Sequence, residues 1–532
     1  MRVPRTDVLA KYVNPPLLRQ VFMKRSAALA AALAVLFCFG YAALHAAAAI
    51  TLLHEFAGGA DDGAEPYARL TLSGSTLFGT TLDGGDAGSG TVFSMNTDGS
   101  GFTLLHEFAG GANNGSGPYA GLTQSGSTLF GTTFAGGGNG LGTVFSINAD
   151  GSGFTLLHEF AGGQNDGWEP IAGVAIGGST LFGTTIFGGD NDEGTLYSIN
   201  SDGSGYRLLR EFAGGANDGA DPGGLTLSGS TLFGTTWAGG DHGGTIFSIN
   251  TDGSGFTLLH EFGGANDGCC PHPLSVLTQS GSTLFGTTYA GGDDYFGTVY
   301  SINTDGSGFT LLHEFAGGAD DGHSPRAGLT LSGSTLYGTT MAGGDNDGGT
   351  VFSINTDGSN FTLLHEFAGG VNDGERPQAG LTLSGSRLFG TTEIGGDNDL
   401  GTVFSIEIPD VDLEGDYNDD NSVDAADYVV WRKNVSQSYE TWRSLFGQSG
   451  PNPPGDFNND HNVDTADYVV WRKTMHADYN TWTTNFAEPS GRAVGSAAAS
   501  SSSTSAPEPA SLLLFLSGLV MCILCTRSER QE

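Results

Sequence analysis

The chain has 532 residues, and its 58 Asp and Glu far outnumber its 20 Lys and Arg, which gives a formal net charge of −38. A chain this acidic has no basic face to neutralise phosphates, so the composition excludes nucleic-acid binding. Glycine contributes 88 residues, yet 38% of the residues are hydrophobic and glycine shows no three-residue period. We therefore expect a folded protein with a sizeable core rather than collagen or a disordered linker.

Residues 1–49 are predicted to be a leader and signal peptide. A basic pair directly follows Met23, an apolar run covers 27–44, and small residues come after it. This order of a charged start, an apolar middle and small residues is typical of secretory signals. The true start is either Met1 or Met23.

The repeated triplet His-Glu-Phe, which is Arg-Glu-Phe in one unit, predicts the architecture. It recurs about every 52 residues and defines seven units over 50–406, and a fixed period of this length is typical of propellers and solenoids. The histidines are His54, His106, His158, His260, His313 and His365, and Arg210 takes the equivalent place in the remaining unit.

Each unit contains four short runs rich in Thr, Phe, Val and Leu, separated by Gly-, Asn- and Asp-rich breakers. In one unit these runs are Phe102–Phe108, Gly121–Gln124, Thr128–Thr133 and Gly142–Asn148. They predict four antiparallel strands, which is the blade of a β-propeller. We therefore expect a mainly β, seven-bladed β-propeller of four-stranded antiparallel blades.

The two ends of the array are complementary. It begins with a lone fourth strand (Thr51–Phe56) and stops after a third strand (Thr402–Ile406). We expect the first strand to complete the last blade and close the ring, which removes the open edges. In antiparallel blades the long loops that follow the second and fourth strands emerge at the same end, so much of the acidic charge is expected there. That charge is either a ligand surface or a solvated rim.

The histidines and cysteines of the repeats are candidate functional residues. The six histidines fall on the predicted outermost strands, far from one another, and we interpret each as half of a structural His–Glu pair. Cys269 and Cys270 form either a vicinal disulfide or two free thiols, and a metal site with His272 lacks a fourth ligand. No catalytic set stands out, so enzymatic activity stays uncertain and is not expected.

The units also resemble the GloVer tandem repeat of choice-of-anchor bacterial proteins. The shared pattern is S-x-L-[FY]-G-T-T followed by G-T-[VIL]-[FY]-S-I-N, as in Ser334–Thr340 and Gly349–Asn355. The resemblance implies an exported surface protein with a variable anchor, and it implies no known reaction.

A linker (407–414) leads into a duplicated segment (415–487), in which GDYNDDNSVDAADYVVWRK and GDFNNDHNVDTADYVVWRK align at an offset of 40. Oxygen-bearing residues occupy loop positions 1, 3, 5, 7, 9 and 12, the alternation with which EF-hand loops surround Ca²⁺ before entering a helix. The predicted Ca²⁺ ligands are Asp416, Asn418, Asp420, Ser422, Asp424, Asp427, Asp456, Asn458, Asp460, Asn462, Asp464 and Asp467.

The duplicated loop and helix resemble the type I dockerin family, which also has Asp at position 12. The resemblance implies a small α-helical, Ca²⁺-binding module that docks on a cohesin-like protein, often in polysaccharide-degrading assemblies. Positions 10 and 11, which help choose the partner in that family, are Ala425-Ala426 and Thr465-Ala466 rather than the common Ser-Thr. A Ca²⁺-stiffened stalk is the alternative role.

The chain ends with a second targeting pattern. A Ser/Ala-rich linker (488–506) precedes a segment (507–532) in which Pro-Glu-Pro is followed by an apolar stretch, Ala510–Thr526, and two arginines. This order resembles the PEP-CTERM sorting signal. It implies export, transient anchoring in the inner membrane by a C-terminal transmembrane helix, exosortase-type processing, and delivery to the cell surface or extracellular matrix. A plain single-span anchor is the alternative.

Taken together, these features favour an exported, surface-associated, non-enzymatic binding or scaffolding protein with a calcium module. The alternative is a carbohydrate-active component that binds a surface polysaccharide or hosts a lyase or hydrolase site. An enzyme should have one blade with irregular polar residues near the axis, and only the fifth unit, with Cys269–His272, is irregular.

Overall fold

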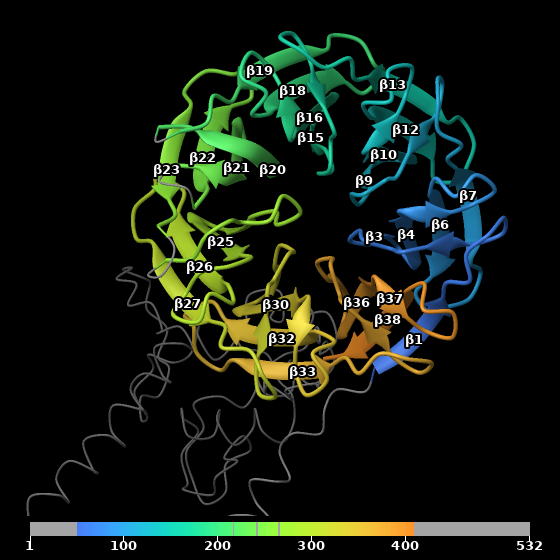
Figure 1. The fold of residues 1–532 in the computed structure, drawn as a ribbon, viewed down its shortest axis with the longest axis vertical. Helices are drawn as coiled ribbons and strands as arrows, with labels where there is room; N and C mark the ends of the chain where they lie inside the picture. The colour runs from blue at the N-terminus through green and yellow to red at the C-terminus, as the bar shows by residue number, and fades with distance from the viewer. Residues whose placement is uncertain (1–49, 216, 241–242, 264–266, 409–532) are drawn as a thin grey trace, which may run out of the picture. The chain divides into compact units, whose positions relative to one another are not determined.

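The structure is a computed structural model that describes residues 50–408, except 216, 241–242 and 264–266. Within these residues the chain forms seven four-stranded antiparallel sheets around a central opening (Figure 1). This confirms the predicted seven-bladed β-propeller. The run Phe102–Phe108 contains strand Thr103–Glu107, so the sequence placed this strand to within a residue at each end.

We number blades 1 to 7 in the chain order of their innermost strands. The innermost strands are β3 (Thr71–Ser73), β9 (Thr123–Ser125), β15 (Ala175–Gly177), β20 (Gly219–Ser228), β24 (Thr278–Ser280), β29 (Thr330–Ser332) and β35 (Thr382–Ser384). The second strands are β4 (Thr76–Thr81), β10 (Thr128–Thr133), β16 (Thr180–Thr185), β21 (Thr231–Gly239), β25 (Thr283–Thr288), β30 (Thr335–Thr340) and β36 (Arg387–Thr392). The third strands are β6 (Thr91–Asn96), β12 (Thr143–Asn148), β18 (Thr195–Asn200), β22 (Thr245–Asn250), β26 (Thr298–Asn303), β32 (Thr350–Asn355) and β38 (Thr402–Glu407). The outermost strands are β7 (Thr103–Glu107), β13 (Thr155–Glu159), β19 (Arg207–Glu211), β23 (Thr257–Glu261), β27 (Thr310–Glu314), β33 (Thr362–Glu366) and β1 (Ile50–Glu55).

The ring is closed by the two ends of the array, as predicted. Strand β1 pairs antiparallel with β38 and becomes the outermost strand of blade 7, with Ile50 opposite Ile406 (Figure 1). A register shift between Leu52 and His54 marks a bulge in this pairing. Every blade therefore has four strands, and the sheet of blade 7 combines the two ends of the described chain.

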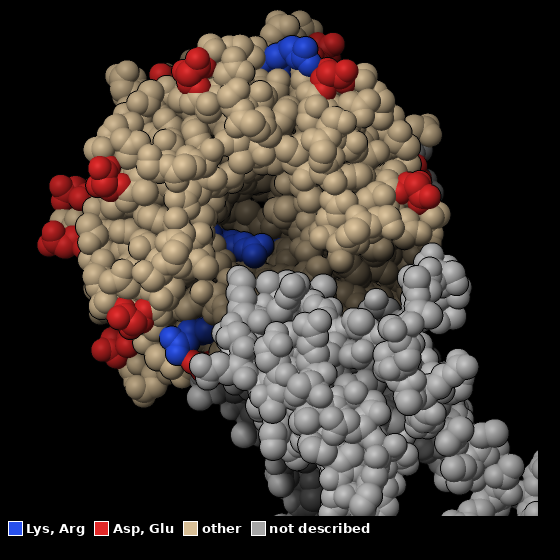
Figure 2. All heavy atoms as spheres, turned by 180° about the vertical axis from the view of Figure 1, so that it is seen from behind, with Lys and Arg blue, Asp and Glu red and all other residues tan. Residues whose placement is uncertain are grey.

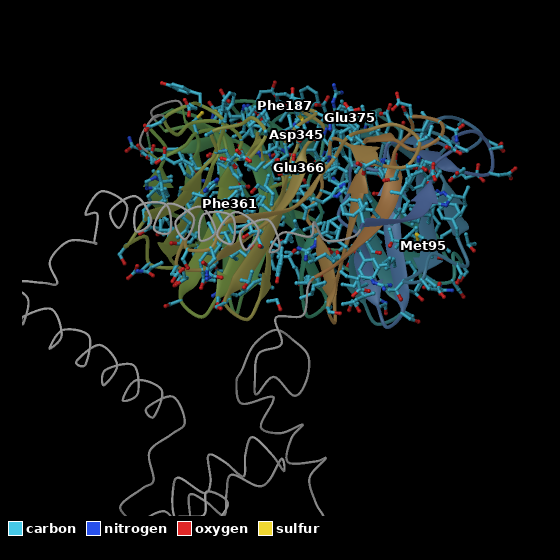
Figure 3. The ribbon with its side chains drawn as sticks, turned by 90° about the horizontal axis from the view of Figure 1, so that it is seen from below. Met95, Phe187, Asp345, Phe361, Glu366 and Glu375 are labelled. Atoms are coloured by element: carbon cyan, nitrogen blue, oxygen red, sulfur yellow. The ribbon has the colours of Figure 1, made fainter. Side chains whose placement is uncertain are left out.

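Short two-stranded ribbons join the long loops at one end of the ring. Each ribbon pairs the loop that enters a blade with the loop after its second strand, which confirms that these loops share an end. Figure 3 shows Phe187, Asp345 and Glu375 along this edge, with Met95 nearer the other. The ribbons are β2 (Gly63–Ala64) with β5 (Asp83–Gly84), β8 (Gly115–Ser116) with β11 (Ala135–Gly136), β14 (Gly167–Trp168) with β17 (Phe187–Gly188), β28 (Gly322–His323) with β31 (Ala342–Gly343), and β34 (Gly374–Glu375) with β37 (Ile394–Gly395).

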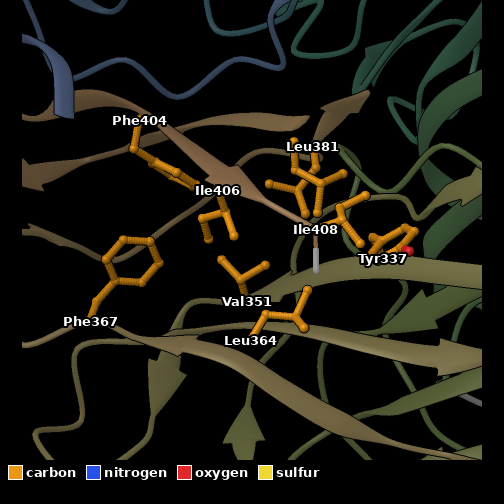
Figure 4. Packing of buried hydrophobic residues seen from close by; sticks show 9 residues of the cluster. Tyr337, Val351, Leu364, Phe367, Leu381, Phe404, Ile406 and Ile408 are labelled. Atoms are coloured by element: carbon orange, nitrogen blue, oxygen red, sulfur yellow. The ribbon is translucent and has the colours of Figure 1, made fainter. Parts of the chain in front are cut away.

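The hydrophobic core lies between neighbouring blades. Val351 of blade 6 packs in one cluster with Leu381, Phe404 and Ile406 of blade 7 (Figure 4). Inside each blade an aromatic ring of the third strand covers the Gly of the Gly-Thr-Thr motif. A Cβ at Gly79, for example, would lie 2.4 Å from Cζ of Phe93, so this position requires Gly.

Threonine hydroxyls connect successive blades around the ring. Thr330 at the start of β29 donates to the carbonyl of Leu381 at 2.5 Å, and Thr382 donates to the carbonyl of Leu70 at 2.5 Å. The second bond crosses the junction between blades 7 and 1. Six of the seven junctions have this bond, and Ala175 replaces the threonine at the junction of blades 3 and 4.

Several predictions concern residues outside the described ranges. The dockerin-like module (415–487) with its twelve calcium ligands, and the transmembrane helix within 507–532, all lie there. Across the parts of 50–408 that the structure describes, no helix is long and apolar enough to cross a membrane. The same described residues contain no cluster of three or more His, Cys, Asp or Glu that could hold a metal ion.

Candidate functional site

The repeated histidines are structural links on the outside of the ring. All six lie on outermost strands, as predicted, and none approaches the channel. The expected His–Glu pairing is wrong, because the partner is a residue of the following long loop. His54 Nε2 lies 3.1 Å from Asp62 Oδ1, and Arg210 replaces His with a 2.9 Å bond to Asp218.

Strand geometry explains this correction. Side chains of adjacent strand residues point to opposite faces, so a His cannot pair with the Glu beside it. The Glu turns toward another loop, where Glu107 Oε2 accepts a hydrogen bond from the backbone N–H of Asp86 at 2.9 Å. Five of the six His rings stack on an aromatic ring of the next blade, as His54 does on Phe102 at 3.8 Å. These five histidines therefore connect blades.

The cysteines of the fifth blade are free thiols, with Sγ atoms 2.9 Å apart. This settles the choice between a disulfide and two thiols for the structure described here. Both side chains are partly exposed.

Two positions of the repeat bring unlike residues to the long-loop end of the channel. One follows the proline that precedes each innermost strand, and the other follows the Thr-Thr pair that ends the second strand. In the five blades that have a ribbon, both positions lie between the ribbon strands and the two inner strands of the blade. In blade 4 they fall within β20 and β21. In chain order the first position holds Tyr67, Tyr119, Ile171, Gly223, His272, Arg326 and Gln378, and the second holds Leu82, Phe134, Ile186, Trp237, Tyr289, Met341 and Glu393.

All polar and aromatic members of this set except Phe134 form a connected arc. We call these eight the mouth residues: Tyr67, Tyr119, Trp237, His272, Tyr289, Arg326, Gln378 and Glu393. They come from every blade except blade 3, where Ile171 and Ile186 stand at the two positions. The sevenfold repetition is thus broken around one opening of the channel.

Glu393 is the centre of the polar half of the arc. Its Oε1 accepts a hydrogen bond from the Tyr67 hydroxyl at 2.5 Å, and its Oε2 accepts one from Gln378 Nε2 at 2.5 Å. Gln378 in turn accepts a bond from Arg326 Nη1 at 2.8 Å through its Oε1. Tyr67 also packs against Tyr119, with ring centroids 4.8 Å apart. One carboxylate and one guanidinium are therefore held apart by a single amide.

Aromatic rings form the other half of the arc. The Arg326 guanidinium lies 5.3 Å from the centre of the Tyr289 ring, within the range of a cation–π contact. Trp237 lies 5.5 Å from Tyr289, and His272 meets Trp237 edge-on at 5.7 Å. In blade 5 this contact places an imidazole against the indole of blade 4.

Burial controls the charge of these groups. Burial, together with the nearby Arg326, lowers the pKa of His272 to about 3, so this imidazole is neutral at pH 7. Burial, together with the bond to Glu393, raises the pKa of Tyr67 above its ordinary value. Arg326 Nε is buried and has no hydrogen-bond partner among the described residues. At neutral pH the mouth residues carry one negative and one positive charge.

The central opening is also visible from the side opposite to the view of Figure 1. On the face shown in Figure 2 acidic side chains lie along the outer rim, and a basic side chain lies inside the opening. The strongly acidic character of the propeller is therefore not a property of the channel wall seen in this view. A negatively charged ligand is not excluded from the channel by the net charge alone.

Sequence reasoning missed most of the mouth residues. It identified the irregular fifth unit with His272, but it searched the repeats for what they share. The signal was available in the columns that vary. Aligning the seven units on the proline and on Thr-Thr shows two columns in which no residue dominates, beside columns that are nearly invariant.

These features define a repeat-built seven-bladed propeller with an asymmetric mouth. The chain belongs to the Gloeobacter/Verrucomicrobia repeat family, whose model matches residues 41–166, 149–334 and 319–429. This confirms the resemblance to that tandem repeat. No curated protein matches the chain.

Several solved structures are similar to parts of this chain. An oligogalacturonate lyase in complex with manganese is 14% identical, with 68% of this chain and 93% of the other covered and a TM-score of 0.44. A computationally designed protein is 15% identical, with 66% and 100% covered and a TM-score of 0.38. A nidogen/laminin complex is 15% identical, with 54% and 92% covered and a TM-score of 0.34. Similarities of this size carry no argument about ligands or activity.

Proposed function

We propose that this protein is an exported binding protein of the cell surface or extracellular matrix that captures its ligand at the mouth residues. The observation that supports this is the loss of sevenfold repetition at the two positions that supply the mouth residues. Positions that serve the fold repeat, as the Thr-Thr pairs do in every blade. Positions free of that role differ from blade to blade and gather the polar and aromatic side chains suited to recognition.

Binding fits the arrangement better than catalysis. Glu393 already accepts two hydrogen bonds, from Tyr67 and Gln378, which occupy both of its oxygens. The neutral His272 lies against Trp237 and carries no hydrogen-bonded nucleophile. A rigid, prearranged set of side chains lowers the entropy lost on binding.

Ligand arrays with matched tryptophan variants test this proposal. Purified full-length protein is applied to glycan and protein arrays, and hits are measured by calorimetry. Trp237→Ala should weaken binding at least about tenfold, as expected for an aromatic anchor. The control is Trp168→Ala, because Trp168 stacks on Phe187 in the ribbon of blade 3, away from the mouth residues. Equal effects of the two variants would contradict binding at the mouth.

We further propose that residues 415–487 bind Ca²⁺ through the twelve oxygen ligands given above and join the propeller to a partner. The support is the EF-hand alternation in both loops. Calorimetric Ca²⁺ titration of the full chain should show saturable binding that is lost in the double variant Asp416→Ala/Asp456→Ala. Asp345→Ala/Asp397→Ala removes the same charge from propeller loops and should leave this binding intact. If the two double variants behave alike, binding is diffuse and the module is not the site.

The sorting tail supports processing by an exosortase-type machinery after transient anchoring in the inner membrane. The candidate partner of the module is a cohesin-like protein, and a calcium-stiffened stalk is the alternative. Expression in a host with and without the exosortase-type machinery tests whether the tail is processed. Only the host with the machinery should release a chain that lacks 507–532.

A carbohydrate-active role is the second candidate function. The observation that favours it is the combination of Trp237 and Tyr289 with Arg326 and Gln378, because aromatic faces pack on sugar rings while planar polar groups bind hydroxyls or carboxylates. Incubation with surface polysaccharides distinguishes the two activities. New reducing ends or unsaturated products would indicate a lyase or hydrolase, and co-sedimentation without products would indicate a binding component.

A further inference from the structure

A bend with positive φ follows the first ribbon strand in every blade. Six of the seven residues there are not glycine, yet all adopt a conformation that L-residues rarely take. Their φ values lie between 53° and 64°: Glu65, Gly117, Glu169, Asp221, Cys270, Ser324 and Arg376. The bend is therefore a constant of the architecture and does not depend on the side chain.

This bend brings two consecutive side chains together. In an extended strand neighbouring side chains point to opposite faces. At the bend of blade 6, however, His323 Nδ1 lies 3.1 Å from Ser324 Oγ, and in blade 7 Glu375 lies 3.7 Å from Arg376 Nε. In blade 5 the same two positions hold cysteines, whose sulfurs lie 2.9 Å apart. The bend thus brings the two thiols close together, which adjacency in the sequence alone would not do.

Backbone hydrogen bonds hold this thiol pair on both sides. Cys269 exchanges bonds with Ala290, donating at 2.7 Å and accepting at 3.2 Å, and Cys270 donates to the carbonyl of Gly243 at 2.6 Å. The carbonyl of Cys270 accepts a bond from the N–H of Tyr289. Both sulfurs remain partly exposed, so small reagents can reach a pair that is already in place.

We propose that Cys269 and Cys270 form a redox-active dithiol that closes reversibly to a vicinal disulfide. The site goes beyond the proposed binding function and does not depend on it. A disulfide needs an S–S length of about 2.05 Å, so the two sulfurs have less than an ångström to travel. Adjacent Cα atoms are only about 3.8 Å apart, below the usual range for disulfides, so the bond is easily reduced again.

The chemistry balances with a small-molecule disulfide as oxidant. The Cys269 thiolate attacks one sulfur of the oxidant and releases the other half as a thiolate, which leaves a mixed disulfide on Cys269. Cys270 then loses its proton and attacks the Cys269 sulfur, which expels the second half of the oxidant. Overall the protein dithiol is oxidised to a disulfide and one oxidant is reduced to two thiols.

The two thiols differ in a way that fits these roles. The hydrogen bond from the Cys270 thiol lowers the pKa of Cys269 to about 7, although burial opposes the shift. The same bond and burial raise the pKa of Cys270. A substantial fraction of Cys269 is therefore thiolate at neutral pH, and Cys270 becomes nucleophilic only after its partner has reacted.

Oxidised glutathione and phenylarsine oxide test the proposal on the reduced full-length chain. After treatment with glutathione disulfide, the peptide that contains both cysteines should lose two hydrogen atoms, carry no glutathione, and return to two thiols with dithiothreitol. Cys270→Ser should retain glutathione on Cys269. Cys269→Ser should react at least about tenfold more slowly. Phenylarsine oxide should bridge the two sulfurs with loss of water, and each Ser variant should fail to form the bridge.

Three results would overturn the proposal. They are stable glutathione on the wild-type pair, two fully alkylated cysteines after oxidation, or no arsenical bridge on the reduced protein. Peptide-level mass spectrometry separates this pair from Cys38, Cys522 and Cys525, and circular dichroism of both Ser variants establishes that they are folded. Each result is independent of whether the mouth residues bind a ligand.

Discussion

The Tyr67 hydroxyl donates a 2.5 Å hydrogen bond to Glu393, which joins the first and last blades of the ring across 326 positions of sequence. Glu393 receives a second bond from Gln378, whose amide orientation is set because its oxygen accepts from Arg326. The carboxylate therefore has two donors and no competing acceptor. Glu393 therefore both connects blade 7 to blade 1 and belongs to the mouth residues.

Glu393→Gln should destabilise the protein because a neutral amide replaces the carboxylate to which Tyr67 and Gln378 both donate, and its nitrogen can no longer accept one of these two bonds. Losing a charge-assisted hydrogen bond costs about 1.5–3 kcal/mol, and urea unfolding should report a loss of this order. Glu407→Gln is the control, since Glu407 is exposed and pairs with Arg387 at the surface, where an ion pair contributes about 0–1 kcal/mol. Equal losses of unfolding free energy in the two variants would mean that the hydrogen bonds of Glu393 contribute no more than a surface ion pair.

Thr382→Val tests ring closure. It removes the hydroxyl that bonds Leu70 across the junction of blades 7 and 1, and it should cost about 0.5–1.5 kcal/mol. Thr330→Val removes the equivalent bond at an internal junction and should cost the same amount. Thermal or urea unfolding gives both values. A silent Thr382→Val beside a costly Thr330→Val would show that the ring is open in solution.

Tyr197→Phe and Tyr300→Phe should stabilise the protein. Both hydroxyls are buried without a hydrogen-bond partner among the described residues, and an unpaired buried hydroxyl costs about 1–3 kcal/mol. The other five blades carry Phe at this position. Tyr206→Phe is the contrasting variant, because the Tyr206 hydroxyl donates to Asp166 at 2.6 Å. Differential scanning calorimetry should show a higher Tm for the first two variants and a lower Tm for the third.

Asn114→Asp should reduce the acid sensitivity of the fold. Burial lowers the pKa of His106, whose partner is Asn114 rather than the Asp found at the equivalent position of the six other blades. The folded state therefore binds this proton less tightly than the unfolded chain, so stability falls as pH drops below about 6.5. A carboxylate at position 114 raises the pKa and opposes that loss.

Urea unfolding at pH 7.5 and at pH 5.5 measures this effect. The loss between the two pH values should be smaller in Asn114→Asp than in the wild type. His106→Gln removes the titrating group and should abolish the difference that Asn114→Asp makes. A larger acid loss in Asn114→Asp would contradict the sign of the shift.

Repetition explains why the fold could be read from the sequence. A strand such as Thr128–Thr133 recurs in every unit with the same breakers, so seven copies average out local ambiguity. The complementary ends predicted the pairing of β1 with β38, because an unpaired edge on each side is costly. These inferences rest on the period of the pattern and on backbone hydrogen bonding alone.

The candidate site could not be predicted in the same way. Tyr67 and Glu393 lie at opposite ends of the array, and nothing in their local sequence indicates that a hydroxyl and a carboxylate meet. The His–Glu interpretation failed for a related reason. His54 pairs with Asp62 of the loop that follows its strand, and strand alternation does not predict the path of that loop. The calcium ligands stay a prediction.

The pairing of β1 with β38 also determines the order in which the blades can form. Blades 1 to 6 are each built from a continuous stretch of chain, so they can form as the polypeptide emerges during synthesis. Blade 7 needs Ile50 and Ile406 together, and such distant contacts form slowly because the whole intervening chain must first be ordered. Strand β1, the first strand to be synthesised, is therefore the last to pair. A chain truncated before β38 would keep an unpaired, aggregation-prone edge at β1.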